Sequence, residues 1–130
     1  MDETAQPPRG TYLCRIDDKG RLKLPMDLVR FFGAYTEFFS TSLDGKTCRI
    51  YPAAERERVE RELSQLDSED AEAVLLYAHH LGGSSEIDGL SRVWISRELR
   101  DKLQISEQRV RLRWVKDHIE VYNEKVDESA

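Results

Sequence analysis

The segment IDDKGRLKLPMDL at residues 16–28 decides the fold expected of this protein, because its pattern returns as IDGLSRVWISREL at residues 87–99. The two segments align without a gap, and the identical pairs are Ile16/Ile87, Asp17/Asp88, Arg21/Arg92 and Leu28/Leu99. The same offset of 71 residues, called the repeat offset from here on, later aligns Cys48, Ile50 and Tyr51 with Ile119, Val121 and Tyr122. Self-similarity at a fixed spacing is typical of a duplicated structural unit, so we expect two related halves.

Each copy has the pattern of strand, turn, strand, short helix, strand and strand. In the first copy, Tyr12–Ile16 and Leu22–Leu24 predict two short strands around a turn at Asp18-Lys19-Gly20. Pro25 is expected at the first position of a helix over Met26–Phe32, which ends at a glycine. The last two strands are indicated by the alternation of Phe39, Thr41 and Leu43, a hairpin turn at Asp44-Gly45 and a return over Cys48–Tyr51.

The second copy replaces these pieces in kind. Ser96 takes the place of the proline as a helix cap. The following strand has one apolar and one basic face, since Val110, Leu112 and Trp114 alternate with Arg109, Arg111 and Arg113. Lys116-Asp117 supplies the turn, and Ile119–Tyr122 returns.

A helical linker is expected between the copies. Val59, Leu63 and Leu66 recur at helical spacing, and Ser68 can cap a second helix that ends at Gly82-Gly83. These patterns predict two antiparallel helices over about residues 54–66 and 68–81. The fold class is therefore α+β, with a first half at 10–53, a helical linker at 54–83 and a second half at 84–125.

Charge is unevenly distributed along the chain, whose net charge is −5. Residues 1–52 have a net charge of +1 and residues 88–116 a net charge of +4, whereas residues 53–87 and 117–130 carry −6 and −4. Because a phosphate backbone responds to the local field rather than to the average, the acidic total does not exclude binding to nucleic acid.

Several other classes of protein are disfavoured. No apolar run is long enough to cross a membrane, and the first residues do not resemble a signal peptide. Cys14 and Cys48 form no CxxC motif, so we expect neither a zinc site nor a disulfide, but buried thiols in a reducing cytosol. The pair His79-His80 is expected on a helix face, not at a metal. Catalytic motifs are missing, which indicates no enzyme, no cofactor and no small-molecule substrate.

The repeated Asp and Arg residues suggest a structural clasp. An Asp four residues before an Arg across a tight turn can accept hydrogen bonds from the turn amides and hold the guanidinium. Asp17 with Arg21 and Asp88 with Arg92 have this spacing. A two-stranded ribbon carrying such arginines fits the major groove, where Arg grips phosphate or reads guanine. The alternative, a solvated surface strand, is favoured for any single residue but not for the repeated cluster.

At DDKGRLKLP and DGLSRVWIS the chain resembles the MraZ family, over roughly residues 10–125. The resemblance implies two tandem AbrB-like (SpoVT/AbrB, swapped-hairpin) β-barrel halves, each with an Asp-x-x-x-Arg signature. It further implies a cytoplasmic, nucleoid-associated repressor that binds direct repeats in its own promoter as a ring-shaped homo-oligomer. The DNA-facing residues that it implies here are Arg15, Lys19, Arg21 and Lys23 in the first half and Arg92, Arg97 and Arg100 in the second.

The chain departs from the family pattern in both halves. Val29 stands in the first half where Arg100 stands in the second, and Leu90, Ser91 and Ser96 replace a polar residue, a glycine and a proline in the second signature. These departures leave open whether the second half contacts DNA or serves assembly. Two other functions also stay open, an AbrB-like antitoxin and a ring scaffold that does not bind DNA.

The aromatic residues are expected to fill the core and subunit contacts rather than to stack on bases. They are Phe31, Phe32, Phe38, Phe39, Trp94 and Trp114. Because a chain of 130 residues covers such faces poorly by itself, we expect a homo-oligomer.

Overall fold

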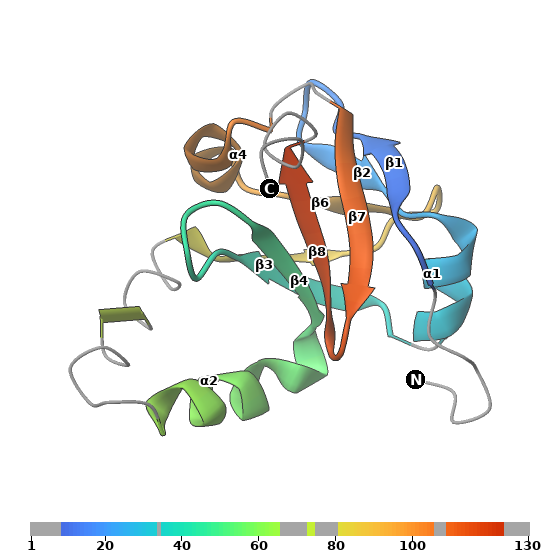
Figure 1. Ribbon diagram of the computed structural model, residues 1–130. Coiled ribbons are helices and arrows are strands. Elements are labelled where there is room, and N and C mark those ends of the chain that lie inside the picture. The colour runs from blue at the N-terminus through green and yellow to red at the C-terminus, as the bar shows by residue number, and fades with distance from the viewer. Residues whose placement is uncertain (1–8, 34, 66–72, 75–80, 106–108, 124–130) are drawn as a thin grey trace.

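The computed structural model describes residues 9–33, 35–65, 73–74, 81–105 and 109–123 (Figure 1). In these ranges the first copy forms β1 (Tyr12–Arg15), β2 (Arg21–Lys23), α1 (Met26–Phe32), β3 (Glu37–Thr41) and β4 (Cys48–Pro52). A 3₁₀ turn at Ala53–Glu55 leads into α2 (Arg56–Ser64). The second copy forms β5 (Gly83–Glu86), β6 (Arg92–Trp94), α4 (Arg97–Leu103), β7 (Arg109–Val115) and β8 (His118–Asn123). The expected α+β class with antiparallel sheets is confirmed.

Strands of the two copies are interleaved in the larger sheet, whose order is β1-β7-β8-β4-β3-β5. All its pairings are antiparallel. The repeat offset carries the bounds of β1 onto β5, of β2 onto β6 and of α1 onto α4. Each first strand pairs with the other copy, β1 with β7 and β5 with β3. The two copies thus share one sheet and cannot form it separately.

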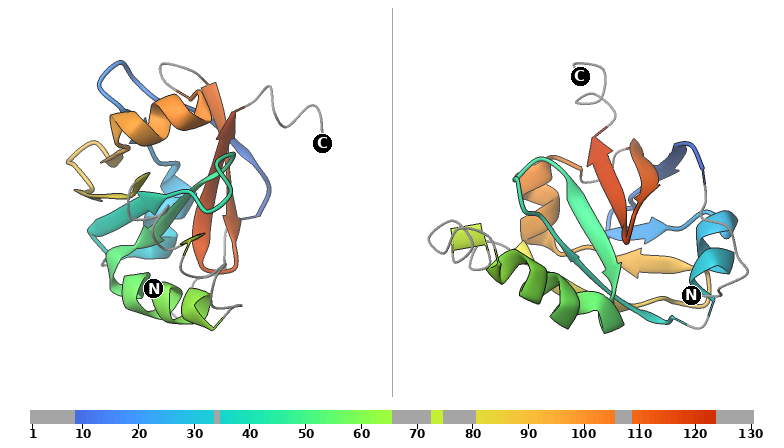
Figure 2. Two further views of the ribbon diagram at one scale, coloured as in Figure 1. Left: turned by 90° about the vertical axis from the view of Figure 1, so that its left-hand side faces the viewer. Right: turned by 60° about the horizontal axis from the view of Figure 1, so that its bottom comes forward.

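The second sheet consists of β2 and β6, which lie side by side between α1 and α4 (Figure 2). Its centre is the pair Leu22 and Val93, which are equivalent at the repeat offset. The backbone N–H of Leu24 donates to Ser91 O and that of Ile95 donates to Gly20 O, both at 2.9 Å. These two bonds are equivalent as well, so the pair has approximate two-fold symmetry.

Most apolar residues of both copies belong to a single core cluster. Phe32 of α1 meets Trp114 of β7 edge-on, with 5.5 Å between ring centroids. Phe31 contacts the same indole at 4.9 Å. Because this contact joins the helix of one copy to a strand of the other, it stabilises the interleaved arrangement and neither copy alone.

Both faces of β3 are covered, so the alternation expected at Phe39, Thr41 and Leu43 is wrong. Residues 38–42 are all buried. Phe38 belongs to the main core, whereas Phe39 stacks on Tyr51 at 5.1 Å beside Val59 of α2. The amphipathic helix α2 therefore covers the face that carries Phe39, and the opposite face, which the alternating pattern assigned to polar residues, meets the main core through Phe38.

The expectations about the helix starts and the linker helices have different outcomes. Pro25 has a ψ of 148° and so is the N-cap of α1 and not its first helical residue. Ser96 does cap α4, since its hydroxyl oxygen accepts the N–H of Leu99 at 3.3 Å. The first linker helix is present as α2, ending at Ser64. Most of the second, expected over 68–81, falls outside the described residues, as does His79-His80.

The expectation that the phenylalanines need a partner chain to cover them is wrong. Phe31, Phe32, Phe38 and Phe39 are at most 8% exposed within one chain. Trp94 is the opposite case, because it is 43% exposed and does not belong to the core. The thiol of Cys48 is buried, and Cys14 is half-buried.

Candidate nucleic-acid interface

The turn between β1 and β2 is held by Asp17. Its Oδ1 accepts the backbone N–H groups of Lys19 and Arg21, both at 2.9 Å. Its Oδ2 accepts Arg21 Nε at 2.7 Å. Gly20 closes the turn with a φ of 85°, a value that costs glycine little because it has no Cβ.

The turn between β5 and β6 repeats this geometry. Asp88 Oδ1 accepts the N–H groups of Leu90 and Arg92 at 2.9 Å, and Oδ2 accepts Arg92 Nε at 2.7 Å. Ser91 occupies the glycine position with a φ of 62°. The clasp therefore survives the loss of the glycine, although a residue with a Cβ is strained in this conformation.

Hydrogen bonding lowers the pKa of both aspartates. The backbone N–H of Arg21 is the main reason that the pKa of Asp17 lies below its ordinary value, and the Arg21 guanidinium and the Lys19 amide add to it. Desolvation opposes the shift at Asp88, but the bonds from Arg92 and Leu90 outweigh it and keep that pKa low too. Both carboxylates are therefore charged at neutral pH.

The outward face of the β2–β6 ribbon carries Arg21, Lys23, Arg92 and Trp94, because Leu22 and Val93 point into the core. Lys19 is exposed at the adjoining turn. The clasp engages only the Nε of each arginine, and within the described residues no hydrogen bond reaches the Nη groups of Arg21 or Arg92. An oriented guanidinium with two open amino groups is suited to bidentate contact with phosphate or guanine.

Arg15 lies on the larger sheet and not on this ribbon. It is exposed on β1, directly opposite Arg109 of β7. The two positions place basic residues side by side on neighbouring strands. Arg15 is thus separated from the residues with which the sequence grouped it.

The two arginines of α4 differ in exposure. The side chain of Arg97 is 84% exposed and lies 3.8 Å from Asp101 Oδ2. Arg100 is 8% exposed, and its Nε donates to Ile95 O at 2.9 Å. Its guanidinium lies against Gly20, so close that a Cβ there would be 2.6 Å from Arg100 Cζ. The described contacts of Arg100 therefore support the first turn and do not present it to solvent.

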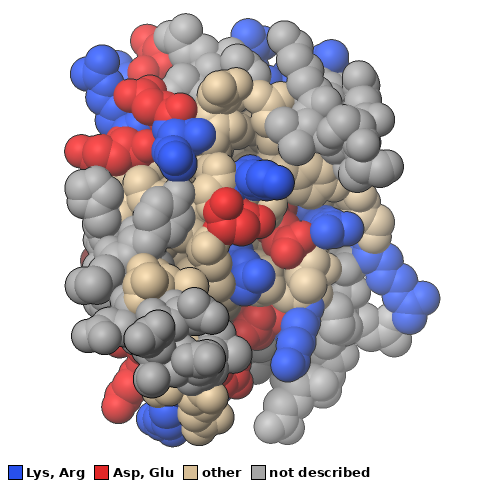
Figure 3. All heavy atoms as spheres, turned by 60° about the vertical axis from the view of Figure 1, so that its left-hand side comes forward, with Lys and Arg blue, Asp and Glu red and all other residues tan. Residues whose placement is uncertain are grey.

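A different face of the molecule, on the side of α2 and α4, has mixed charge (Figure 3). Basic and acidic side chains alternate over the part of it that is described. On α2, for example, Arg58 contacts Glu55 at 2.6 Å, Glu62 at 2.9 Å and, across the molecule, Asp117 at 2.8 Å. Such paired charges tie elements together and give little net field for a polyanion.

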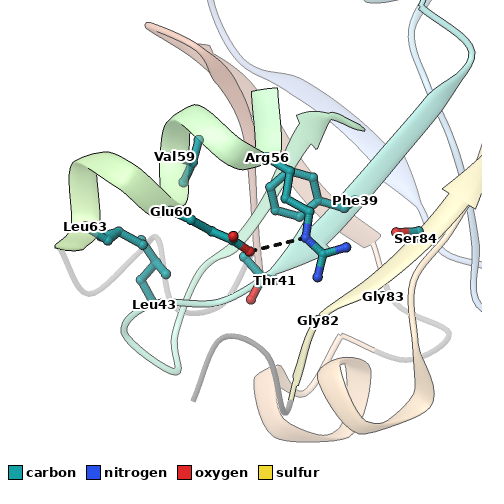
Figure 4. Close-up of a pocket in the computed structure, with 10 residues that line it drawn as sticks. All are labelled: Phe39, Thr41, Leu43, Arg56, Val59, Glu60, Leu63, Gly82, Gly83 and Ser84. Atoms are coloured by element: carbon teal, nitrogen blue, oxygen red, sulfur yellow. Dashed lines mark hydrogen bonds and ion pairs between the residues drawn. The ribbon is translucent and has the colours of Figure 1, made fainter. Parts of the chain in front are cut away.

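A pocket of about 240 Å³ lies between α2, β3 and β5 (Figure 4). Phe39, Val59 and Leu63 form apolar walls. Arg56 Nε contacts Glu60 Oε1 at 3.4 Å on one side. Thr41 and Ser84 add polar groups to the lining.

Neither a metal site nor a membrane span is found in the described part of the chain. No three His, Cys, Asp or Glu side chains in it are grouped as metal ligands would be. None of its helices combines the length and apolar character needed to span a membrane.

Trp94 was missed as a candidate site residue. The sequence interpretation placed it in the core or at subunit contacts, although RVWIS alternates so that Trp94 shares the face of Arg92 and not that of Val93. Arg109 was recognised as basic but not as the neighbour of Arg15, because that pairing joins residues far apart in the chain.

Known proteins that are similar to this chain share one description. A transcriptional regulator MraZ from Acidobacterium capsulatum is 37% identical over 102 residues, which cover 75% of this chain and 70% of that protein. A transcriptional regulator MraZ from Koribacter versatilis is 39% identical over 102 residues, covering 75% and 69%. One from Nitrosococcus oceani is 28% identical over 104 residues, covering 76% and 70%. No protein-family model matches the chain.

Proposed function

Since the chain belongs to the MraZ family of transcriptional regulators, we propose that it is a sequence-specific DNA-binding repressor that places its β2–β6 ribbon in the major groove. The family is non-enzymatic. One observation carries the proposal: two turns with the same hydrogen bonds orient Arg21 and Arg92 on one outward face. A two-stranded antiparallel ribbon has the width that the major groove admits.

The residues of this face have separate roles in the proposal. Arg21 and Arg92 contact phosphate or guanine through their Nη groups, while Asp17 and Asp88 act as the clasps that aim them. Lys19 and Lys23 contact phosphates as mobile point charges. Arg97 and Arg15 extend the interface to flanking phosphates. Arg100 supports the Gly20 turn from inside and reaches no DNA.

The proposal also covers the fold of the two copies and the assembly of the chains. We assign residues 10–53 and 84–125 to two tandem SpoVT/AbrB-like swapped-hairpin halves, joined by a helical hairpin over 54–83. The element bounds that coincide at the repeat offset support this assignment. We further propose a ring-shaped homo-oligomer that binds direct repeats in its own promoter and associates with the nucleoid. The exposed side chain of Met26, at 55%, offers apolar surface for a subunit contact.

The experiment measures affinity for the DNA upstream of the protein's own gene as a function of salt. A Lys23→Ala variant is compared with Lys46→Ala, whose side chain is exposed between β3 and β4, outside the ribbon. Removing one phosphate contact flattens the plot of log affinity against log salt by about 0.9 for each subunit engaged. Lys23 is the cleaner test, because replacing Arg21 also leaves Asp17 without its partner.

We expect the Lys23 variant to lower both affinity and salt slope, and the Lys46 variant to match the parent. Equal behaviour of all three proteins would show that the DNA lies on another face. A parent protein that does not distinguish its promoter from random DNA would contradict the repressor and favour a scaffold.

A further inference from the structure

The outward face of the ribbon is not symmetric. At the repeat offset Arg21 corresponds to Arg92, but Lys23 corresponds to Trp94. The indole is 43% exposed and stands directly opposite Arg21 in the pairing of β2 with β6. One end of the face is therefore doubly basic, with Lys23 opposite Arg92, and the other combines a guanidinium with a large apolar ring.

The indole of Trp94 packs on β5. Its Cζ3 lies 3.6 Å from the position that a Cβ would take at Gly83 of β5. At the repeat offset Gly83 of β5 corresponds to Tyr12 of β1. The first copy thus has its aromatic residue on its first strand, whereas the second copy has Trp94 on its second strand. Ser85 Oγ accepts the backbone N–H of Trp94 at 2.9 Å. The indole thus packs on β5, while the residue remains 43% exposed.

We propose that Trp94 contacts a thymine C5-methyl group in the major groove and so gives the second copy a base preference that the first copy lacks. This rests on the proposed DNA-binding function. The methyl group of thymine is the apolar feature at base edges of the major groove, and it is read by apolar side chains. The cations beside Trp94, namely Arg21, Lys23 and Arg92, favour a polyanionic partner over a second apolar protein surface.

The test removes the methyl group and the indole in turn. Promoter DNA is prepared with deoxyuridine in place of thymidine, which deletes every C5-methyl group and keeps Watson–Crick pairing. The affinities of the parent and of Trp94→Ala are measured on both DNAs. Leu13→Ala is the control, since it removes another exposed apolar side chain, 52% exposed, from the outer face of β1.

We expect deoxyuridine to lower the affinity of the parent for promoter DNA about fourfold for each indole engaged. This is the fold-change that corresponds to burying one methyl group. The Trp94 variant is expected to lose this difference, whereas the Leu13 variant keeps it. As a second readout, Trp94 is the remaining tryptophan in a Trp114→Phe protein, and its fluorescence should change when promoter DNA is added.

Two results would overturn the inference. If Trp94→Ala retains the full difference between thymidine and deoxyuridine DNA, the indole does not read the methyl group. If light scattering shows that Trp94→Ala loses oligomeric mass without DNA, the indole belongs to a subunit contact. A parent that fails to bind its promoter at all is a separate outcome, because it contradicts the proposed function itself.

Discussion

The guanidinium of Arg100 in α4 lies against Gly20 in the turn between β1 and β2, where a Cβ would be 2.6 Å from Cζ. The equivalent positions in the other copy are Val29 and Ser91. Two departures that look independent in the sequence are therefore two sides of one contact. In the structure Arg100 lies on a glycine, whereas the other copy has a valine and a serine at these two positions.

This relationship predicts a compensated double substitution. Gly20→Ser alone should reduce the free energy of unfolding by about 2–3 kcal/mol, because it combines a φ of 85° with overlap against Arg100. Adding Arg100→Val recreates the pair found in the other copy and should recover about 1 kcal/mol relative to the sum of the single changes. Denaturant unfolding of the single and double variants measures the coupling. Gly89→Ser is the control, since a Cβ there meets nothing within 4 Å.

The clasps predict a dependence of stability on acid pH. The pKa values of Asp17 and Asp88 are lowered in the folded protein. Their contribution to the free energy of unfolding is therefore complete above the ordinary aspartate pKa of about 4, and it is lost as pH falls through the folded pKa. The melting temperature of Asp17→Asn/Asp88→Asn should therefore fall less steeply below about pH 4 than that of the parent. Asp18→Asn, at the exposed neighbour of the first clasp, should follow the parent curve. Parallel curves for all three proteins would mean that the clasps do not stabilise the fold.

Arg58 should matter more than its neighbour Arg56. It joins α2 to the β7–β8 turn through Asp117 at 2.8 Å and also contacts Glu55 and Glu62. Arg56 has the looser pair with Glu60, at 3.4 Å. Arg58→Ala should destabilise by about 1–2 kcal/mol and Arg56→Ala by less than about 1 kcal/mol. Thermal unfolding decides between them, and an equal loss would show that the contact with Asp117 is screened away.

The cap of α4 predicts that proline is better tolerated than alanine at position 96. Ser96 has a φ of −59° and a ψ of 152°, nearly those of Pro25 at the start of α1. Ser96→Ala loses the bond to the Leu99 N–H and should cost about 1 kcal/mol. Ser96→Pro loses the same bond but restricts the unfolded chain, which offsets about 0.4–1 kcal/mol. A proline variant less stable than the alanine variant would show that the backbone at position 96 is not free to accept the ring.

The sequence by itself determined the local parts of this protein. The Asp17 and Asp88 clasps and the helices α1 and α4 occur where the repeated segment places them. Each depends on interactions between residues only a few positions apart, such as the hydrogen bond between an aspartate and the residue four positions later. Such interactions are encoded in the spacing of neighbouring residues, and a second copy of the spacing reproduces them.

Only the tertiary structure decided which copy each strand completes and which basic residues face outward. Arg15 meets Arg109 because β1 pairs with the other copy, and Arg100 is buried because α4 packs over the turn of the other copy. Trp94 is exposed because β6 pairs with β2 and leaves the indole on the outer face of the ribbon. Alternation within a strand says which residues share a face, but pairing between distant segments decides whether that face meets the core, a helix or water.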